Sequence, residues 1–318
     1  MSQLSKSITI LTIASLGAYT SQKYLIGQAH AEAPEPETSA PPVMFRGFRP
    51  ASLRVQSVET LNHNTKRLRF EYPDKSWASG LHLTSSLLTI CWPQESWLPA
   101  IRPYTPVSSL HLRGTIDLVI KRYPNGKVSS HLHTLNPGDT IYFLGALPGY
   151  RWVTPDKPSK VYLIAGGSGI TPLYQLARGI LENPHDQSKV HLVYGANTVH
   201  DLFLKQELDD LRARFGERLR VDYLVSEGRG SSSSSLSMDE DGEKDGNEAL
   251  VRYGARVSTG LLGQVFRRDR QPGAAGDEKV VVCGPPGMVE VLVGGGWGSR
   301  ESGILAELGF GKDRVHVC

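Results

Sequence analysis

Between Phe45 and about Pro155, short runs of alternating apolar and polar residues are separated by turns. The runs are SLRVQSVE, KRLRFEY, SLLTICW, TIDLVIKRY and DTIYFLG. A period of two is typical of strands that bury one face, and only Val128 to Leu135 has the pattern of a short helix. Strands at this density predict a small antiparallel barrel or sandwich.

The pattern changes at Lys160, where continuous apolar runs begin to alternate with segments of helical periodicity. The runs are KVYLIAGGSG, KVHLVYG and RLRVDYLVS, and the helical segments are TPLYQLARGILE and DLFLKQELDDLRARFGE. Strands that alternate with helices of this length indicate a parallel sheet with crossover helices. A chain of 318 residues suits about two domains. We therefore predict a β domain over residues 45–156 and an α/β domain over residues 157–318.

Three segments lie outside this pattern. Residues 1–28 are apolar from Ile8 to Leu16 and again near Ile26, which favours a membrane anchor or targeting segment over a cleaved signal, a gene-model artefact or a plain helix. Residues 29–44 are rich in Pro, Ala and Glu and are typical of an extended tether. Residues 227–250 are rich in Ser, Gly and acidic residues, which predicts a disordered surface insertion.

Charge and cysteine content exclude several classes of protein. The chain has 35 basic and 32 acidic residues, so its net charge of +3 does not indicate nucleic-acid binding. Cys91, Cys283 and Cys318 lack the spacing of a zinc site or a disulfide framework, which favours a reducing or mixed compartment. His131 and His133 are two residues apart and do not share a helical face, so we interpret them as surface or packing residues and predict no metal site.

Two motifs of the first domain combine charge with aromatic surface. RPYTPVSS begins at Arg102 and offers a planar fork of donors for phosphate, an aromatic face and hydroxyls on a segment that its prolines keep extended. In TIDLVIKRY the aliphatic residues at 116, 118 and 120 share one face, and Asp117, Val119, Lys121 and Tyr123 share the other. The second face either lines a ligand or is the solvated side of a barrel strand.

Three further motifs place glycines beside the starts of helices. Gly126 precedes KVSS at the start of the short helix, where unpaired amides can bind an anion. GGSGITP, residues 166–172, closes a strand and opens a helix, and KVVVCGPPGM places Cys283 just after another strand. Ligands of open parallel sheets bind beyond the carboxyl ends of strands, where both turns fall. The alternative for Cys283 is a buried small hydrophobic residue.

Together, in their order and spacing, these five motifs resemble the NADH-cytochrome b5 reductases, a family of the ferredoxin-reductase-type flavoproteins. The resemblance extends from about Phe48 to Cys318, and GFGKDRVHVC resembles the carboxyl-terminal strand of the family. It implies a six-stranded antiparallel FAD-binding barrel followed by a doubly wound parallel-sheet NAD(P)H-binding domain.

The resemblance also implies residues that bind FAD. Arg102 would pair with the FAD phosphates, and Tyr104 and Thr105 would hold the ribityl chain and the edge of the ring. The whole flavin surface would be Arg102, Pro103, Tyr104, Thr105, Val119, Lys121 and Tyr123. The pyrophosphate would be received by Gly126, Lys127, Val128 and Ser129.

In the second domain the resemblance assigns Gly166, Gly167 and Ser168 to nucleotide and flavin together. It places the nicotinamide beside Cys283, Gly284, Pro285 and Pro286. Thr105, Lys121 and Cys283 are the candidate catalytic residues, because the Thr105 hydroxyl or Lys121 would stabilise negative charge on reduced flavin and Cys283 would border the nicotinamide.

The implied activity is hydride transfer from NADH to FAD, followed by single electrons to a haem protein such as cytochrome b5. The turn GANTVHD has no cation for an extra phosphate and favours NADH over NADPH, although Arg229 could reverse this. Alternatives are a mitochondrial flavoprotein that supports cytochrome c haem attachment, and a flavin-fold binding module without turnover. We expect a monomer in a mitochondrial membrane, inner or outer, or alternatively in the endoplasmic reticulum, with Lys121, Arg122 and Lys127 steering an acidic partner.

Overall fold

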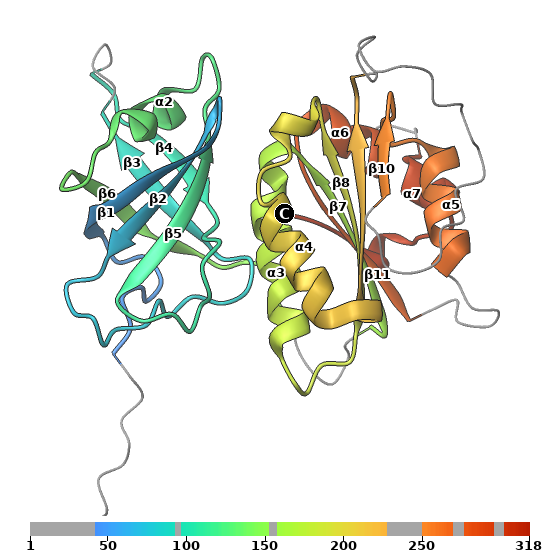
Figure 1. Ribbon diagram of the computed structural model, residues 1–318, viewed down its shortest axis with the longest axis horizontal. Helices are drawn as coiled ribbons and strands as arrows, with labels where there is room; N and C mark the ends of the chain where they lie inside the picture. The colour runs from blue at the N-terminus through green and yellow to red at the C-terminus, as the bar shows by residue number, and fades with distance from the viewer. Residues whose placement is uncertain (1–41, 93–96, 153–157, 228–249, 270–276, 296–301) are drawn as a thin grey trace, which may run out of the picture. The chain divides into compact units, whose positions relative to one another are not determined.

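The computed structural model describes residues 42–92, 97–152, 158–227, 250–269, 277–295 and 302–318. It contains a six-stranded antiparallel sheet followed along the chain by a six-stranded parallel sheet with helices (Figure 1). This confirms the predicted fold class. The predicted anchor over 1–28, most of the tether over 29–44 and residues 228–249 of the predicted insertion lie outside the described residues. Among the helices that the structure does describe, none is long and apolar enough to cross a membrane.

The antiparallel sheet has the strand order β4-β3-β6-β1-β2-β5. Its strands are β1 (Ala51–Asn62), β2 (Thr65–Glu71), β3 (Ser86–Cys91), β4 (Ala100–Tyr104), β5 (Thr115–Lys121) and β6 (Thr140–Leu147). Every residue of β5 from Ile116 to Ile120 is buried, but the predicted alternation of faces is confirmed, because Leu118 and Ile120 lie in the core of this sheet and Val119 lies in the core of the parallel sheet. Phe70 and Phe143 meet edge to face in the same core, with ring centroids 5.7 Å apart.

The two edges of this sheet meet the short helix α2 (Lys127–Thr134), which packs against β3, β4 and β5. Val128 and Leu132 of α2 are buried in the core of the antiparallel sheet. The RPYTPVSS motif begins within β4, which the sequence indicated only as an extended segment. Pro103 pairs with Leu88 of β3 on one side only, which suits a residue without an amide hydrogen because β4 is an edge strand.

The parallel sheet has the strand order β10-β9-β8-β7-β11-β12. Its strands are β7 (Lys160–Gly166), β8 (Lys189–Ala196), β9 (Leu219–Val225), β10 (Leu250–Tyr253), β11 (Glu278–Cys283) and β12 (Val315–Val317), and neighbouring strands pair in parallel. The order reverses at β7, which lies between β8 and β11. An open parallel sheet binds ligands at such a switch point.

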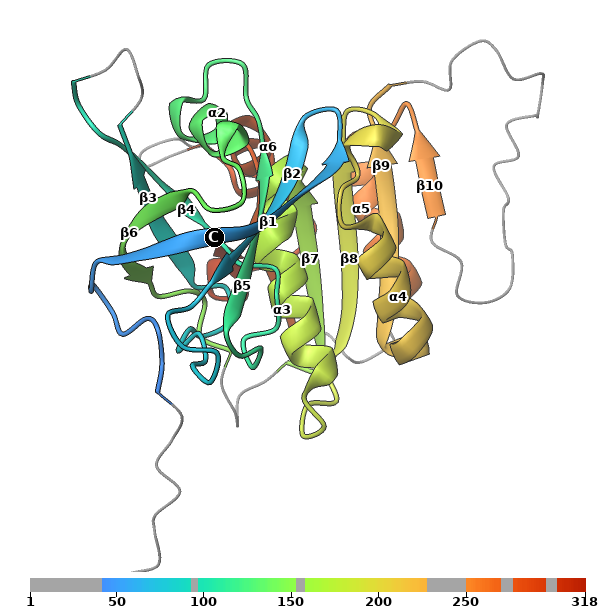
Figure 2. The ribbon, with the colours of Figure 1, turned by 60° about the vertical axis from the view of Figure 1, so that its left-hand side comes forward.

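Helices cover both faces of the parallel sheet, as the two views show (Figures 1 and 2). One face carries α3 (Ile170–Glu182) and α4 (Lys205–Phe215), and the other carries α5 (Thr259–Asp269), α6 (Pro286–Val293) and α7 (Ile304–Glu307). In β7, Val161 and Leu163 face the first group, and Tyr162 and Ile164 face the second. The continuous apolar runs of the sequence are therefore strands buried on both faces.

The structure differs from the sequence prediction at the start of α4. The helical pattern began at Asp201, but Val199–Asp201 form a single 3-10 turn and α4 begins at Lys205. Leu204 separates the two with a left-handed backbone, φ 63°. Asp201 therefore lies outside α4, and its side chain binds Lys121 of β5.

Candidate functional site

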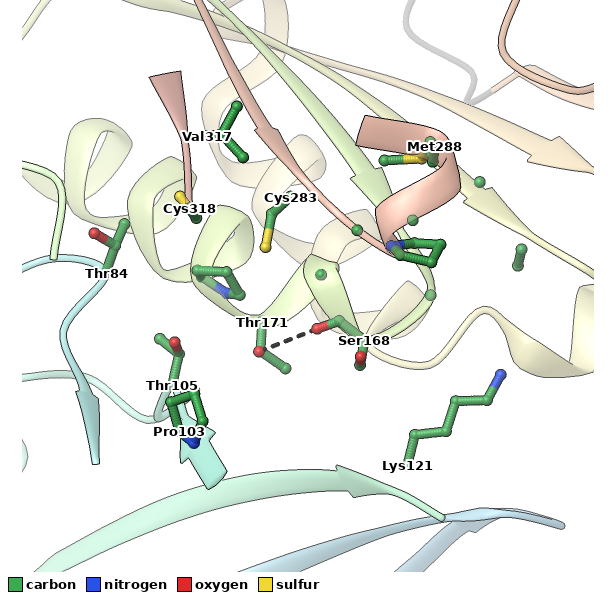
Figure 3. A pocket seen from close by; sticks show the side chains of 18 of the residues that line it. Thr84, Pro103, Thr105, Lys121, Ser168, Thr171, Cys283, Met288, Val317 and Cys318 are labelled. Carbon is green, nitrogen blue, oxygen red and sulfur yellow. Dashed lines mark hydrogen bonds between the residues drawn. The ribbon is translucent and has the colours of Figure 1, made fainter. Parts of the chain in front are cut away.

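A cavity of about 1140 Å³ is lined by residues from both sheets. The antiparallel sheet contributes the ends of β4 and β5, and the parallel sheet contributes the turns that follow β7 and β11 (Figure 3). These turns lie on either side of the reversal in strand order. The cavity therefore occupies the position where an open parallel sheet binds its ligand.

Most of the predicted flavin surface lines this cavity. The lining residues from that set are Pro103, Tyr104, Thr105, Val119, Lys121 and Tyr123. Thr105 is buried, and its hydroxyl shares a 2.8 Å hydrogen bond with the hydroxyl of Ser86. Burial raises the pKa of Tyr104 well above its ordinary value, so this phenol stays protonated at neutral pH. The alternation of TIDLVIKRY thus separated core residues from cavity residues, except for Asp117, which binds Arg69 at 2.7 Å.

Both predicted glycine turns line the cavity and pack against each other. Gly166, Gly167, Ser168, Cys283, Gly284 and Pro285 are all lining residues. A Cβ on Gly169 would lie 2.2 Å from the carbonyl oxygen of Cys283, and a Cβ on Gly284 would lie 3.2 Å from the Cα of Gly166. The two turns therefore approach backbone to backbone, which requires glycine.

A second group of predicted residues lies outside the cavity lining. The group is Arg102, Gly126, Lys127, Val128, Ser129 and Pro286. The exposed Arg102 donates to the carbonyl of Ile101 at 2.7 Å. Val128 is a core residue, and the Ser129 hydroxyl donates to the carbonyl of Gly126 at 3.1 Å. The side chains of Val128 and Ser129 therefore stabilise the turn and do not face a ligand. Of this segment, the backbone amides at the start of α2 remain for an anion, because the described chain provides no side-chain cap for them.

Lys121 and Tyr123 link the antiparallel sheet to the parallel sheet. The Lys121 ammonium donates to the Asp201 carboxylate at 2.8 Å, and both side chains are largely buried, with 15% and 8% of their surface exposed. The Tyr123 and Ser168 hydroxyls share a hydrogen bond of 2.7 Å. Lys121 is therefore an ion-paired residue at the edge of the cavity.

Asp201 is a residue that the sequence analysis missed. Burial alone would raise its pKa, but the bonds from Lys121, Asn64 and Thr198 lower it overall. The spacing of Thr198 and Asp201 is a helix-capping signal, since the Thr198 hydroxyl accepts from the Asp201 amide at 3.2 Å. No local signal connects Asp201 to Lys121, which is far away in sequence.

Sequence reasoning also missed residues that line the opposite end of the cavity. Tyr150, which follows β6, contacts His316 of β12 with ring centroids 4.4 Å apart. Burial, and next the charge of Lys279, lowers the pKa of His316, so this imidazole is neutral at pH 7. Arg256 and Cys318 line the cavity as well. For His316 and Cys318 the sequence contained a weak signal, because both lie in GFGKDRVHVC, whose resemblance indicated only a strand.

These features fit two nucleotides rather than one small ligand. The volume is above the usual range for a site that holds one drug-sized molecule. The glycine turns leave backbone exposed where a pyrophosphate can approach, and α2, whose first amides have no side-chain cap, packs against β4, which carries Arg102. Residues 126–129 and Arg102 are candidates for holding the phosphates of FAD, and the cavity has room for a ring together with a nicotinamide.

Sequence comparisons agree with this division. Residues 52–152 match the profile of an oxidoreductase FAD-binding domain, and residues 163–293 match that of an oxidoreductase NAD-binding domain. The prediction of one FAD-binding and one NAD-binding half is confirmed by these matches. Among solved structures, the cytochrome b5 reductase domain of Ulva prolifera nitrate reductase has a TM-score of 0.67 at 22% identity, covering 88% of this chain and 100% of that one. This likeness supports the fold.

Curated relatives extend the match to nearly the whole chain. The NADH-cytochrome b5 reductase 2 of Emericella nidulans is 39% identical over 300 residues, covering 92% of this chain and 85% of the relative. The protein of the same name from Aspergillus oryzae is 39% identical over 311 residues, covering 96% and 88%. On this similarity, the chain belongs to the NADH-cytochrome b5 reductase family.

Proposed function

We propose that the protein is an FAD-dependent oxidoreductase that takes a hydride from NADH and passes single electrons to a haem protein such as cytochrome b5. The observation that carries this proposal is one cavity that is shared by the end of β4, the alternate residues of β5 and both glycine turns; the residues in and just after the two strands are Pro103, Tyr104, Thr105, Val119, Lys121 and Tyr123. Two relatives that cover most of the chain are named for this activity. When bound, FAD would supply the chemistry of hydride acceptance and single-electron release.

The residues of the chain bind and orient the reactants. Arg102 and the first amides of α2 would bind the phosphate groups, and Tyr104, Thr105 and Val119 line the cavity that would hold the ring. The Thr105 hydroxyl would donate to developing negative charge if Ser86 is the donor in their shared bond, and Lys121 would act there with its own charge balanced by Asp201. Holding two rings in contact in a mostly apolar cavity supplies proximity, and no general base is needed for hydride transfer.

An anaerobic titration tests this proposal directly. The purified holoprotein should bleach with NADH, bleach less readily with NADPH, and recover its colour when oxidised cytochrome b5 is added. Asn197 and Ser226 line the cavity beyond β8 and β9, where an adenosine ribose would be held, but the exposed Arg256 also lines it and could accept an extra phosphate. Equal bleaching by both nucleotides would show that the site also accepts NADPH, and Arg256 would be the candidate partner of its extra phosphate.

The same titration separates the alternatives. A colourless protein that cannot be reconstituted with FAD would make it a binding module without turnover. Reoxidation by a protein of cytochrome c haem attachment, but not by cytochrome b5, would identify the other acceptor. For an acidic haem protein, Arg122 and Lys127 are exposed and available for steering, whereas Lys121 is held by Asp201.

Arg102→Ala should weaken the retention of FAD. Removing a charged phosphate partner costs about 1.5–3 kcal/mol, so we expect the dissociation constant of FAD to rise at least about tenfold. Flavin absorbance per protein after gel filtration measures the loss. The matched control is Arg113→Ala, because Arg113 is also exposed and donates to one carbonyl, that of Ser76 at 3.2 Å, away from the cavity. Equal flavin content in both variants would refute the role of Arg102.

Cys283→Ala should slow reduction by NADH while FAD stays bound. Cys283 is half-buried and lines the cavity at the start of the turn that follows β11. The loss of its side chain would therefore loosen the position of the nicotinamide. We expect the rate of flavin bleaching in a stopped-flow experiment to fall about tenfold. Cys91→Ala is the control, because Cys91 is buried in the antiparallel sheet and does not line the cavity. A wild-type rate for Cys283→Ala would reduce this thiol to a packing role.

We also propose that the protein is monomeric and is held on a mitochondrial membrane, or alternatively on the endoplasmic reticulum, by residues 1–28. The support is the density of apolar residues from Ile8 to Leu16, followed by the Pro, Ala and Glu segment. Without residues 1–41, the protein should move from the membrane pellet to the supernatant and keep its NADH:ferricyanide activity. A truncated protein that stays in the pellet after alkaline extraction would contradict the anchor.

A further inference from the structure

Two of the three cysteines lie opposite each other at the ends of β11 and β12. These strands pair in parallel with Val280 opposite Val315 and Val282 opposite Val317. The register continues past the last strand pair, since the Cys318 amide donates to the carbonyl of Val282 at 3.0 Å. The next residues in this register are Cys283 and Cys318.

The two side chains also share a face of the sheet. Val280 and Val315 belong to the core beneath α5 and α7, so Cys283 and Cys318, each three residues further on, face the opposite side. Both line the cavity, and Figure 3 shows the two side chains near each other on neighbouring strands. Neighbouring strands are about 4.8 Å apart, which is within the range of Cα separations that a disulfide spans. In the structure both thiols are free.

The environment makes the two thiols unequal. The hydrogen bond between the two thiols lowers the pKa of Cys318, and the same contact, followed by burial, raises the pKa of Cys283. Cys318 is exposed and Cys283 is half-buried. Cys318 is therefore the accessible nucleophile, and Cys283 is the resolving partner behind it.

We propose that Cys283 and Cys318 form a dithiol that closes reversibly into a cross-strand disulfide and thereby slows the use of NADH. The disulfide itself depends only on the register and the shared face. Its effect on the rate rests on the function proposed above, in which Cys283 borders the nicotinamide.

A low-molecular-weight disulfide such as oxidised glutathione supplies the oxidising equivalents. The Cys318 thiolate attacks one sulfur of oxidised glutathione, which forms a mixed disulfide and releases one glutathione thiolate. Cys283 then loses its proton to solvent and attacks the Cys318 sulfur, which expels the second glutathione. Two protein thiols are oxidised, one glutathione disulfide is reduced to two thiols, and dithiothreitol reverses the exchange.

Closure would act on the tightest part of the site. Cys283 leads directly into Gly284, and a Cβ on Gly284 would already lie 2.4 Å from Met288 and 3.2 Å from Gly166. A bond from Cys283 to Cys318 would fix the Cys283 sulfur against β12 and pull on this packed turn. A displacement of a fraction of an ångström where two rings must meet is enough to slow hydride transfer.

The test treats the purified holoprotein with oxidised glutathione and measures mass and flavin reduction on the same sample. We expect a product lighter by two hydrogen atoms, a peptide in which Cys283 and Cys318 are linked, and a fall of about tenfold in the rate of bleaching by NADH. Dithiothreitol should restore both mass and rate. The variant Cys318→Ser, compared with itself before and after treatment, should show neither change, and Cys91→Ser should respond as the wild type does.

The two readouts separate this proposal from the function beneath it. A stable glutathione adduct on Cys318 without the cross-link, or an equal loss of rate in Cys318→Ser, would overturn the dithiol. A cross-linked peptide without any change in the rate would overturn the effect on NADH use. Absence of bleaching in the untreated protein would count against the proposed function alone, because the cross-link is detected by mass.

Discussion

Gly169→Val is expected to destabilise the protein and to weaken its affinity for NADH more than any other single change at the glycine turns. A Cβ at this position would lie 2.2 Å from the carbonyl oxygen of Cys283 and 2.7 Å from the amide nitrogen of Gly284. Both contacts are backbone atoms, which cannot swing aside as a side chain can. Overpacking of this kind costs about 1–3 kcal/mol, and we expect the free energy of unfolding to fall by at least about 2 kcal/mol. Denaturant unfolding measures this loss.

The same clash separates the turn after β7 from the turn after β11, so the dissociation constant for NADH should rise by at least about tenfold, or 1.4 kcal/mol. Gly260→Ala is the control, because a Cβ at Gly260 in α5 would meet nothing within 4 Å. Alanine is a better helix former than glycine, and this variant should be equal to or slightly more stable than the wild type. Wild-type stability for Gly169→Val would show that the two turns can separate freely.

Much of the fold was predictable because local periodicity determines which residues a strand buries. The alternation of TIDLVIKRY separated Leu118 and Ile120, which are core residues, from Val119 and Lys121, which line the cavity. The apolar run of β7 predicted a strand buried on both faces, and helices cover both. The glycine turns were predictable for the same reason, since their sequence position after strands fixes them at one edge of a parallel sheet.

The remaining parts of the site depend on contacts between residues that are far apart in sequence. Nothing in GANTVHD indicates that Asp201 meets Lys121, because the pair exists only after two separately predicted segments have packed together. Cys283 and Cys318 meet only through the pairing of β11 with β12, and β12 is three residues long. Periodicity assigns a residue to a face, but it does not assign a partner on another element.

Asp201→Asn is the second change with a large expected effect. It removes the carboxylate that pairs with the Lys121 ammonium, and only 15% of the Lys121 side chain is exposed to solvent. Leaving a buried charge without its partner costs about 3–5 kcal/mol, and we expect the lower end of that range in denaturant unfolding. The double variant Asp201→Asn with Lys121→Gln should cost less than the sum of the single variants, because it removes the unpaired ammonium.

The pH dependence of this loss follows from the pKa of Asp201. Burial opposes the charged form, but the bonds from Lys121, Asn64 and Thr198 lower the pKa of folded Asp201 below its ordinary value. A carboxyl with a lowered folded pKa contributes stability above the unfolded pKa and loses it as the pH falls through the folded value. The difference between wild type and Asp201→Asn should therefore be constant at neutral pH and shrink below about pH 4.

Glu59→Gln is the surface comparison for this variant. Glu59 binds Arg67 at 3.1 Å with 59% of its side chain exposed, so its loss should cost under about 0.5 kcal/mol. A loss of similar size for Asp201→Asn, or a difference from the wild type that persists unchanged at acid pH, would show that Lys121 and Asp201 form only a solvated surface pair. In that case Lys121 would be free to turn into the cavity. The edge of the cavity would then carry the positive charge of an unpaired lysine instead of a neutral ion pair.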